Sequence, residues 1–146
     1  MAHRIIVDIH KNEDIAEARR KGRELSKSLR FGNVNQVRII TAISELARNI
    51  VLYADYGQIS IEQMLVEHTV GIKVIAKDSG WGIEDVAKVM KDGYSTSSGL
   101  GFGLPGVRRL MDEFKIESRV GKGTEVTVIK WREDVRFKSS DRGTVI

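Results

Sequence analysis

The chain has 146 residues, and its 24 lysines and arginines against 20 acidic residues give a formal net charge of +4. This length suits one domain that folds without disulfides or a structural metal. The absence of cysteine excludes disulfides, thiolate metal sites and a cysteine nucleophile. No apolar run approaches the roughly 20 residues of a membrane span, and the N-terminus lacks the pattern of a signal peptide, so we expect a cytoplasmic protein.

The positive charge does not by itself predict a nucleic-acid partner. The isoelectric point is near 9.4, but basic and acidic residues alternate from Glu17 to Glu24, and no dense Lys/Arg block carries interleaved aromatics. A solvated helix face with i,i+4 ion pairs explains this pattern better. We expect neither a nucleic acid nor a membrane among the partners.

The first part of the chain predicts a strand followed by two amphipathic helices. Isoleucine and valine favour a short strand over Arg4–Ile9. Apolar residues at helical spacing predict a helix from Glu13 to about Leu29, with Asn12 as its N-cap. A second helix, from about Val34 to Tyr53, has a wide apolar face, so we expect it to be largely buried.

The middle of the chain predicts a β-hairpin and then a short helix. Strands are expected over Gln58–Val66 and Val70–Lys77, joined by a turn near Glu67–Thr69. The helix is expected over Ile83–Lys91. The following segment, Gly93–Gly103, is rich in glycine, serine and threonine and has no hydrophobic period, which indicates a loop.

The last part predicts one more helix, a second hairpin and a polar tail. The helix is expected over Leu104–Phe114, and the hairpin strands over Lys115–Val120 and Thr124–Trp131. We expect a domain over residues 1–131 and a mixed-charge tail over Arg132–Ile146. Because hairpins are interspersed with helices, a two-layer α/β sandwich is favoured over a doubly wound parallel sheet.

Glycines cluster in one region of the chain. Seven of the 14 lie from Gly80 to Gly106, and such clustering indicates backbone that must approach a ligand closely. Gly101–Gly106 matches G-x-G-x-x-G, but no predicted strand precedes it, as a dinucleotide-binding turn requires. The P-loop pattern and the H-R-D and D-F-G motifs of eukaryotic-type protein kinases are absent from the sequence.

A different constellation of residues suits Mg-ATP. Glu45 and Asn49 lie four residues apart on the second predicted helix, so they share a face. Asp78–Gly82 follows a predicted strand, Gly99–Gly103 leads into a helix N-terminus, and Thr124 opens the last strand. Each group alone would be an ordinary helix, turn or strand segment, but together they favour a ligand site.

Each of these residue types has a chemical use toward Mg-ATP. Asn49 offers a hard oxygen to Mg²⁺, and Glu45 can accept the proton of an attacking hydroxyl. Asp78 accepts hydrogen bonds when ionised, so it suits the exocyclic amine of adenine and repels the carbonyl of guanine. The backbone N–H groups of Gly99–Gly103 and the dipole of the following helix favour phosphates.

Three segments resemble, in order, the N, G1 and G2 boxes of the GHKL ATPase/kinase superfamily: Glu45–Asn49, Asp78–Gly82 and Gly99–Gly103. Within that superfamily the chain is similar, over roughly Ile5–Trp131, to the small bacterial switch kinases of the anti-sigma and stressosome pathways. The resemblance implies a Bergerat-type α/β sandwich, with a mixed, mostly antiparallel sheet and helices on one face.

The resemblance also implies a set of site residues. Glu45 would be catalytic, Asn49 would bind Mg²⁺, and the cofactors would be ATP and Mg²⁺. The residues expected to bind the nucleotide are Asn49, Asp78, Gly80, Gly82, Gly99, Leu100, Gly101, Phe102, Gly103 and Thr124. Trp81 is bulky for a position within the tight G1 turn.

The implied activity is transfer of the γ-phosphoryl group of ATP to a serine or threonine of STAS-domain partner proteins. The resemblance further implies that the released kinase binds and activates a downstream PP2C-type phosphatase. The alternative is a nucleotide-dependent binding switch without kinase turnover, against which the presence of Glu45 and Asn49 argues. The sequence leaves three roles open for Arg48: phosphate binding, a partner surface or a salt bridge.

Overall fold

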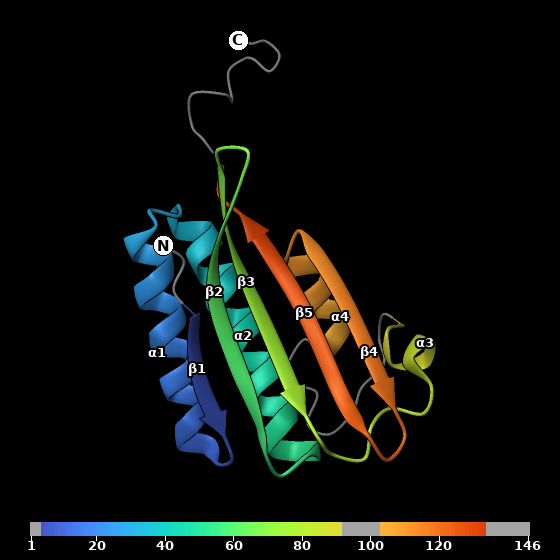
Figure 1. Cartoon of the computed structure of the whole chain (residues 1–146). Helices are drawn as coiled ribbons and strands as arrows, with labels where there is room; N and C mark the ends of the chain where they lie inside the picture. The colour runs from blue at the N-terminus through green and yellow to red at the C-terminus, as the bar shows by residue number, and fades with distance from the viewer. Residues whose placement is uncertain (1–3, 92–102, 134–146) are drawn as a thin grey trace.

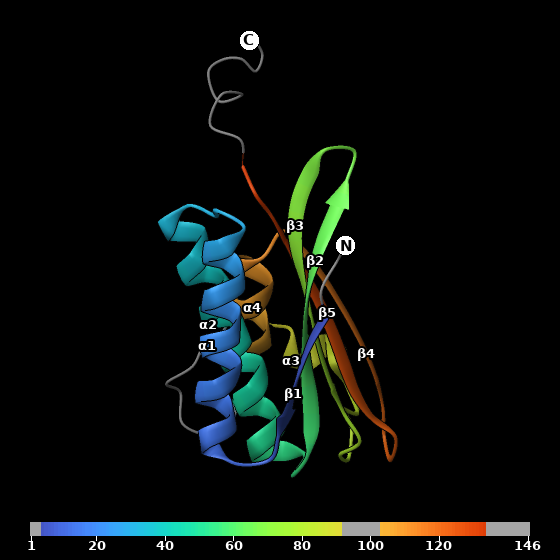
Figure 2. The same ribbon diagram turned by 60° about the vertical axis from the view of Figure 1, so that its left-hand side comes forward.

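The computed structural model describes residues 4–91 and 103–133, which form a five-stranded sheet with helices on one face (Figure 1). In chain order the elements are β1 (Arg4–Ile9), α1 (Asn12–Ser28), α2 (Asn33–Tyr53), β2 (Gly57–Val66), β3 (Thr69–Asp78), α3 (Val86–Val89), α4 (Gly103–Leu110), β4 (Glu113–Arg119) and β5 (Gly123–Trp131). Figure 2 shows α1, α2 and α4 on the same side of the sheet, which confirms the two-layer prediction. None of the described helices is long and apolar enough to cross a membrane.

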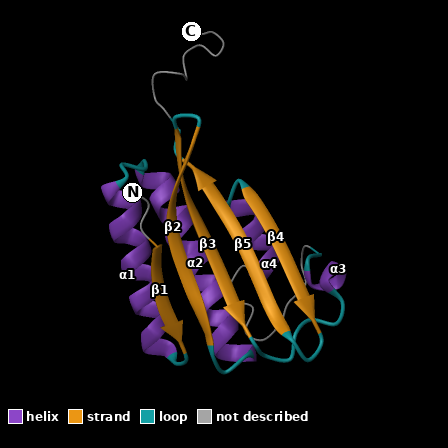
Figure 3. Cartoon of the chain, viewed as in Figure 1, coloured by secondary structure: helices purple, strands orange, loops and turns teal. Residues whose placement is uncertain are grey.

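The strands lie in the order β1-β2-β3-β5-β4, and each neighbouring pair is antiparallel (Figure 3). The expected antiparallel character of the sheet is therefore confirmed, and the pairs between these five strands include no parallel one. Both predicted hairpins form, as β2–β3 and β4–β5. Insertion of β5 between β3 and β4 brings the end of β3 next to the start of β5.

The sheet face that meets the helices carries the core. Side chains alternate between the two faces of a strand, and two cross-strand rows on this face are buried: Val7–Ile59–Ala76–Val126 and Ile61–Val74–Val128. The central helix α2 packs on them with a wide apolar face of six buried residues: Ile39, Ala42, Ile43, Leu46, Ala47 and Ile50. Two residues further along the strands, the same face continues as the row Gly57–Asp78–Thr124–Ser118. The apolar core thus ends in polar residues at one end of the sheet.

Helix α1 begins one residue earlier than predicted, and Asn12 is not its N-cap. Lys11 occupies the N-cap position. The capping carboxylate is that of Asp14, which accepts hydrogen bonds from the backbone N–H groups of His10 (2.9 Å) and Lys11 (3.0 Å). A carboxylate in the first turn also interacts favourably with the helix dipole, and this frees Asn12 from a capping role.

Asp14 makes the stability of the fold depend on pH. The backbone hydrogen bonds from Lys11 and His10 lower the pKa of its carboxyl group below the usual value. A depressed folded pKa stabilises the protein above the unfolded pKa, and this contribution is lost as the pH falls through the folded pKa. We expect Asp14→Asn to lower the melting temperature at pH 7 and the difference from wild type to shrink as the pH falls through the folded pKa, as followed by circular dichroism. A difference that persists undiminished at pH 2 would contradict the assignment.

Two predicted helices are shorter in the structure than expected from the sequence. The helix predicted over Ile83–Lys91 is a single turn, Val86–Val89, because the Ile83 N–H bonds the Ser118 hydroxyl (2.7 Å) and fixes the preceding segment to β4. The helix predicted to reach Phe114 ends at Leu110. There the Asp112 N–H donates to the Ile129 carbonyl (2.9 Å), so the chain has already joined the sheet.

Lys130 anchors the C-terminal end of α4. It is 6% exposed, and its Nζ donates to the carbonyl of Leu110 (2.8 Å) and to Oδ1 of Asp112 (3.3 Å). The ammonium group therefore satisfies a carbonyl at the negative end of the helix dipole. A lysine at a core-facing position is thus explained by the helix end that it meets.

Replacing Lys130 by alanine should lower the free energy of unfolding by about 2–4 kcal/mol, because a charge-assisted hydrogen bond and buried methylenes are lost. Equilibrium unfolding in urea measures the change. The control is Lys115→Ala, whose side chain is 72% exposed and 3.5 Å from Glu117, and which should change the free energy by no more than about 0.5 kcal/mol. Equal effects of the two variants would show that Lys130 does not hold α4.

Candidate nucleotide-binding site

The end of α2 and the turn after β3 lie directly against each other. A Cβ placed on Gly80 would be 2.7 Å from the Cβ of Ala54, so the two backbones approach too closely for a side chain there. At the start of β2, Gly57 pairs with Asp78. Asn49 therefore lies about one helical turn before the place where α2 meets the predicted nucleotide-binding turn. The structure thus brings the C-terminal end of the helix that carries Glu45 and Asn49 against the G1 turn.

Asp78 has one carboxylate oxygen engaged by backbone and one left for a ligand. Its Oδ1 accepts hydrogen bonds from the N–H of Gly80 (2.9 Å) and of Thr124 (3.3 Å). Its Oδ2 has no hydrogen bond to any residue in 4–91 or 103–133. The two backbone contacts fix the orientation of the carboxylate, and the free oxygen suits a donor such as the adenine amine.

Ser118 is a member of the site that the sequence did not reveal. Its hydroxyl lies 2.7 Å from the Thr124 hydroxyl, accepts from the Ile83 N–H (2.7 Å) and reaches the Gly123 carbonyl (3.1 Å). It therefore orients Thr124 and ties the segment after the G1 turn to β4. The signal was present: in β4 a serine replaces the apolar residue that alternation would place after Phe114 and Ile116.

The glycines of the two turns are required by backbone conformation and by close packing. Gly82 (φ 90°) and Gly123 (φ 108°) have left-handed backbones. A Cβ on Gly82 would overlap the Arg119 carbonyl oxygen, and one on Gly123 would overlap the Asp78 carbonyl oxygen. The turn after β3 is thus held against the β4–β5 turn. Trp81 is 70% exposed, so its bulk is accommodated in solvent and does not disturb the turn.

Glu45 is a largely buried residue whose carboxylate has no partner among the described residues. It is 6% exposed, and no described residue forms a hydrogen bond or ion pair with it. Asn49, one turn later on α2, is half-buried. The Glu45 carboxylate oxygens are not among the fully buried polar atoms that lack a partner, so they reach the protein surface on the helix that carries Asn49, where a ligand or a reacting hydroxyl can meet them.

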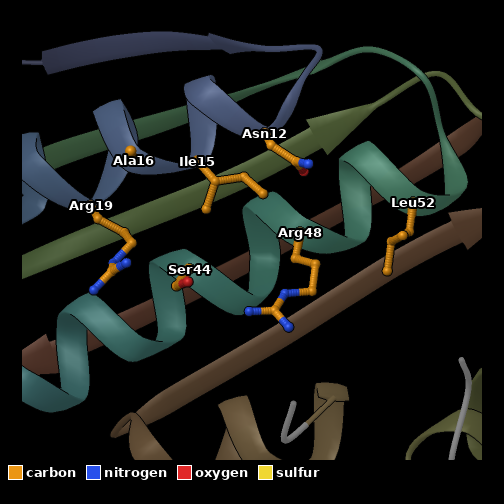
Figure 4. Close-up of a pocket in the computed structure, with 7 residues that line it drawn as sticks. All are labelled: Asn12, Ile15, Ala16, Arg19, Ser44, Arg48 and Leu52. Atoms are coloured by element: carbon orange, nitrogen blue, oxygen red, sulfur yellow. The ribbon is translucent and has the colours of Figure 1, made fainter. Parts of the chain in front are cut away.

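The remaining predicted site residues lie at the start of α4 or outside the described residues. Gly99, Leu100, Gly101 and Phe102 are outside them, whereas Gly103 is the first residue of α4, with φ 65°. Among residues 4–91 and 103–133, no three histidine or acidic side chains cluster as a metal site. Arg48 lines a groove between α1 and α2 (Figure 4).

Known proteins share both the sequence and the fold of this chain. Residues 34–135 match the family model of histidine kinase-, DNA gyrase B- and HSP90-like ATPases. The serine/threonine-protein kinase RsbT of Bacillus subtilis is 61% identical over 118 residues, which cover 81% of this chain and 89% of the relative. An anti-sigma F factor of Caldanaerobacter subterraneus is 37% identical over 101 residues, 64% of this chain and 68% of that protein.

The fold comparison agrees with the sequence comparison. A crystal structure of the RsbU and RsbW domains of Rv1364c from Mycobacterium tuberculosis superposes with a TM-score of 0.60. It is 20% identical, and the match covers 91% of this chain and 33% of that one. The chain therefore belongs to the histidine kinase-, DNA gyrase B- and HSP90-like ATPases and, among them, to the RsbT-type serine/threonine-protein kinases.

Proposed function

We propose that this kinase transfers the γ-phosphoryl group of ATP to a serine or threonine of STAS-domain proteins in a bacterial partner-switching pathway. The observation that carries the proposal is Glu45, a residue only 6% exposed whose carboxylate has no partner among the described residues. It lies on the same helix as Asn49, and that helix meets the turn that holds Asp78. A carboxylate that is not engaged in an ion pair is available to accept the proton of the acceptor hydroxyl.

The transfer step follows from this placement. The acceptor Oγ attacks the γ-phosphorus, and the new O–P bond forms as the bond to the β–γ bridging oxygen breaks. ADP leaves with the electron pair of that bond, and the hydroxyl proton passes to the Glu45 carboxylate. Catalysis in this class of reaction comes mostly from positioning and from stabilisation of phosphate charge. Glu45 orients the acceptor and receives its proton.

The donor set of the described residues fits a nucleotide with Mg²⁺. Asp78 Oδ2 would accept a hydrogen bond from the adenine amine. Thr124 is next to Asp78, because its N–H donates to Asp78 Oδ1, and its hydroxyl is oriented by Ser118. Asn49 would hold Mg²⁺, which binds few protein oxygens and otherwise phosphate and water. The ion would neutralise charge on the phosphates. Gly80 and Gly82 would let the backbone pass the base. Gly99–Gly103, of which the structure describes Gly103 alone, would bind phosphates as the sequence predicts.

The proposed partners are proteins. STAS-domain proteins are the phosphoryl acceptors, and the kinase that they release binds and activates a PP2C-type phosphatase in the cytoplasm. The name of the B. subtilis relative supports serine or threonine as the acceptor residue. The names of the anti-sigma F relatives support a role in capturing and releasing protein partners.

The experiment is phosphoryl transfer from γ-labelled ATP to purified STAS-domain proteins encoded in the same genome, with Asn49→Ala as the control. Label on a partner serine or threonine that is absent in the control is the expected result. ATP binding without label on any of these proteins would favour the alternative, a nucleotide-dependent binding switch. Failure to bind ATP at all would reject both functions.

A further inference from the structure

Two hydroxyl groups and a carboxylate form a row across three strands at the polar end of the sheet. Asp78 of β3 lies opposite Thr124 of β5, which lies opposite Ser118 of β4. Residues in directly opposite positions of antiparallel strands have Cβ atoms about 4.5–5.5 Å apart, so the Thr124 side chain lies between the other two. A ligand group that meets the Asp78 carboxylate is therefore within reach of the Thr124 hydroxyl.

The contacts of Ser118 determine where its single hydroxyl proton lies. A serine hydroxyl has one donor and two acceptor positions. The Gly123 carbonyl, 3.1 Å away, can only accept, so the Ser118 proton points to it. The Ile83 N–H, 2.7 Å away, can only donate, so it takes one of the two acceptor positions. One acceptor position of Ser118 remains, and the Thr124 hydroxyl lies 2.7 Å from the Ser118 oxygen.

Thr124 therefore donates its own proton to Ser118. A distance of 2.7 Å between two hydroxyl oxygens is that of a well-formed O–H···O hydrogen bond. With its proton used in this way, Thr124 has only lone pairs left for a ligand. The free Oδ2 of Asp78 also has only lone pairs, because an ionised carboxylate cannot donate. The two side chains thus present two acceptors next to each other.

The opposite arrangement of the protons loses a hydrogen bond. For Thr124 to donate to a ligand, Ser118 would have to turn its proton to Thr124 and give up its bond to the Gly123 carbonyl. The net contribution of one such bond corresponds to about three- to tenfold in an equilibrium constant. The hydrogen bonds of Ser118 therefore favour the state in which Thr124 accepts.

We propose that Ser118 is a positioning residue for nucleotide specificity, because it takes the proton of Thr124 and leaves Thr124 and Asp78 as paired acceptors for the exocyclic amine of adenine. This inference rests on the proposed function, in which the base lies at this end of the sheet. The amine has two N–H donors, whereas guanine carries a carbonyl acceptor at the same place. A base with that carbonyl would meet two acceptors and no donor from this pair.

The test compares the Kd of the full-length protein for ATP and for inosine triphosphate (ITP), measured by calorimetric titration with Mg²⁺ present. ITP has a carbonyl in place of the exocyclic amine of ATP and lacks the additional amine of GTP. Ser118→Ala frees the Thr124 proton to meet this carbonyl, so the ratio of the Kd for ITP to the Kd for ATP should fall by about three- to tenfold. A purely structural role of Ser118 would weaken both nucleotides equally, and an unchanged ratio would overturn the proposal.

A double-mutant cycle tests whether Ser118 acts through Thr124. Thr124→Val removes the hydroxyl and keeps the shape of the side chain, so it should lower the ratio by itself. In that background Ser118→Ala should leave the ratio unchanged, because no Thr124 proton remains to be redirected. A further fall of the ratio in the double variant would overturn the proposal, since Ser118 would then act on the base by another route.

Three variants serve as controls, and all should keep the wild-type ratio. Ser118→Thr retains a hydroxyl at the same position. Ser60→Ala removes a buried hydroxyl of β2 that has no hydrogen-bond partner among the described residues. Thr127→Val repeats the Thr124 change on the opposite face of β5. A lowered ratio in Ser60→Ala or Thr127→Val would make the loss of selectivity a general effect of altering the sheet and would overturn the proposal.

The outcome for Ser118 can be separated from that for the proposed function, because nucleotide binding is measured without an acceptor protein. An unchanged ratio in Ser118→Ala, with transfer to a STAS-domain protein intact, overturns the role of Ser118 and leaves the function. A lowered ratio in a protein that transfers no phosphate to any STAS-domain protein rejects the function and retains the role of Ser118. A wild-type protein that binds ITP as tightly as ATP, or binds neither, overturns the specificity proposal.

Discussion

Replacing Glu45 by glutamine is expected to lower kcat for phosphoryl transfer by about 10²–10⁴-fold, the range of general-base catalysis. Glutamine has the same shape as glutamate but cannot accept the proton of the acceptor hydroxyl. The test is specific because Glu45 forms no ion pair with a described residue, so the substitution breaks none. The Kd for ATP should change by less than about threefold, because the lost interaction is one made in the transition state.

Steady-state transfer of labelled phosphate and direct nucleotide binding separate these two quantities. Asn49→Ala is the comparison variant, and it should weaken Mg-ATP binding as well as turnover. Glu24→Gln, at an exposed position of α1, should leave both at wild-type values. A Glu45→Gln enzyme that transfers phosphate at the wild-type rate would reject the general-base role and leave the carboxylate without an assigned function.

The strands and the long helices follow closely from local sequence patterns. Period-two and period-3.6 apolar patterns placed β1 at Arg4–Ile9 and ended α2 at Tyr53, as the structure has them. The errors occur where a tertiary hydrogen bond overrides local preference. Ser118 holds the segment before α3 extended, and Asp112 joins the sheet where the pattern predicted a helix. Neither partner is near in sequence, so propensity alone could not reveal them.

The residue types of the candidate site could be predicted from the sequence, but the strand pairings and hydrogen bonds that join these residues could not. The spacing of Glu45 and Asn49 on one helix is visible in the sequence. Asp78 pairs with Thr124 because β5 lies between β3 and β4. A sequence pattern does not specify this strand order. The same limit applies to Arg48, whose place in the α1–α2 groove follows from helix packing.

Asp78→Asn is expected to raise the Kd for ATP by about 100-fold or more, since a charge-assisted hydrogen bond is lost and an unfavourable contact replaces it. The asparagine carbonyl oxygen can still accept the N–H groups of Gly80 and Thr124, which hold Oδ1 in the wild type. Its amide group then occupies the position of Oδ2 and directs a donor at the adenine amine, which is also a donor. The fold should therefore persist while the base contact is lost.

Urea unfolding and nucleotide titration distinguish a binding defect from a folding defect. The free energy of unfolding should stay within about 1 kcal/mol of wild type, because the backbone hydrogen bonds are retained. The preference for ATP over GTP should also fall, because the new amide matches the guanine carbonyl. Asp78→Ala, which removes the acceptor of both N–H groups, should lose stability as well as binding. Wild-type ATP affinity in Asp78→Asn would show that this carboxylate does not contact the base, and the adenine site would then have to lie elsewhere on the sheet.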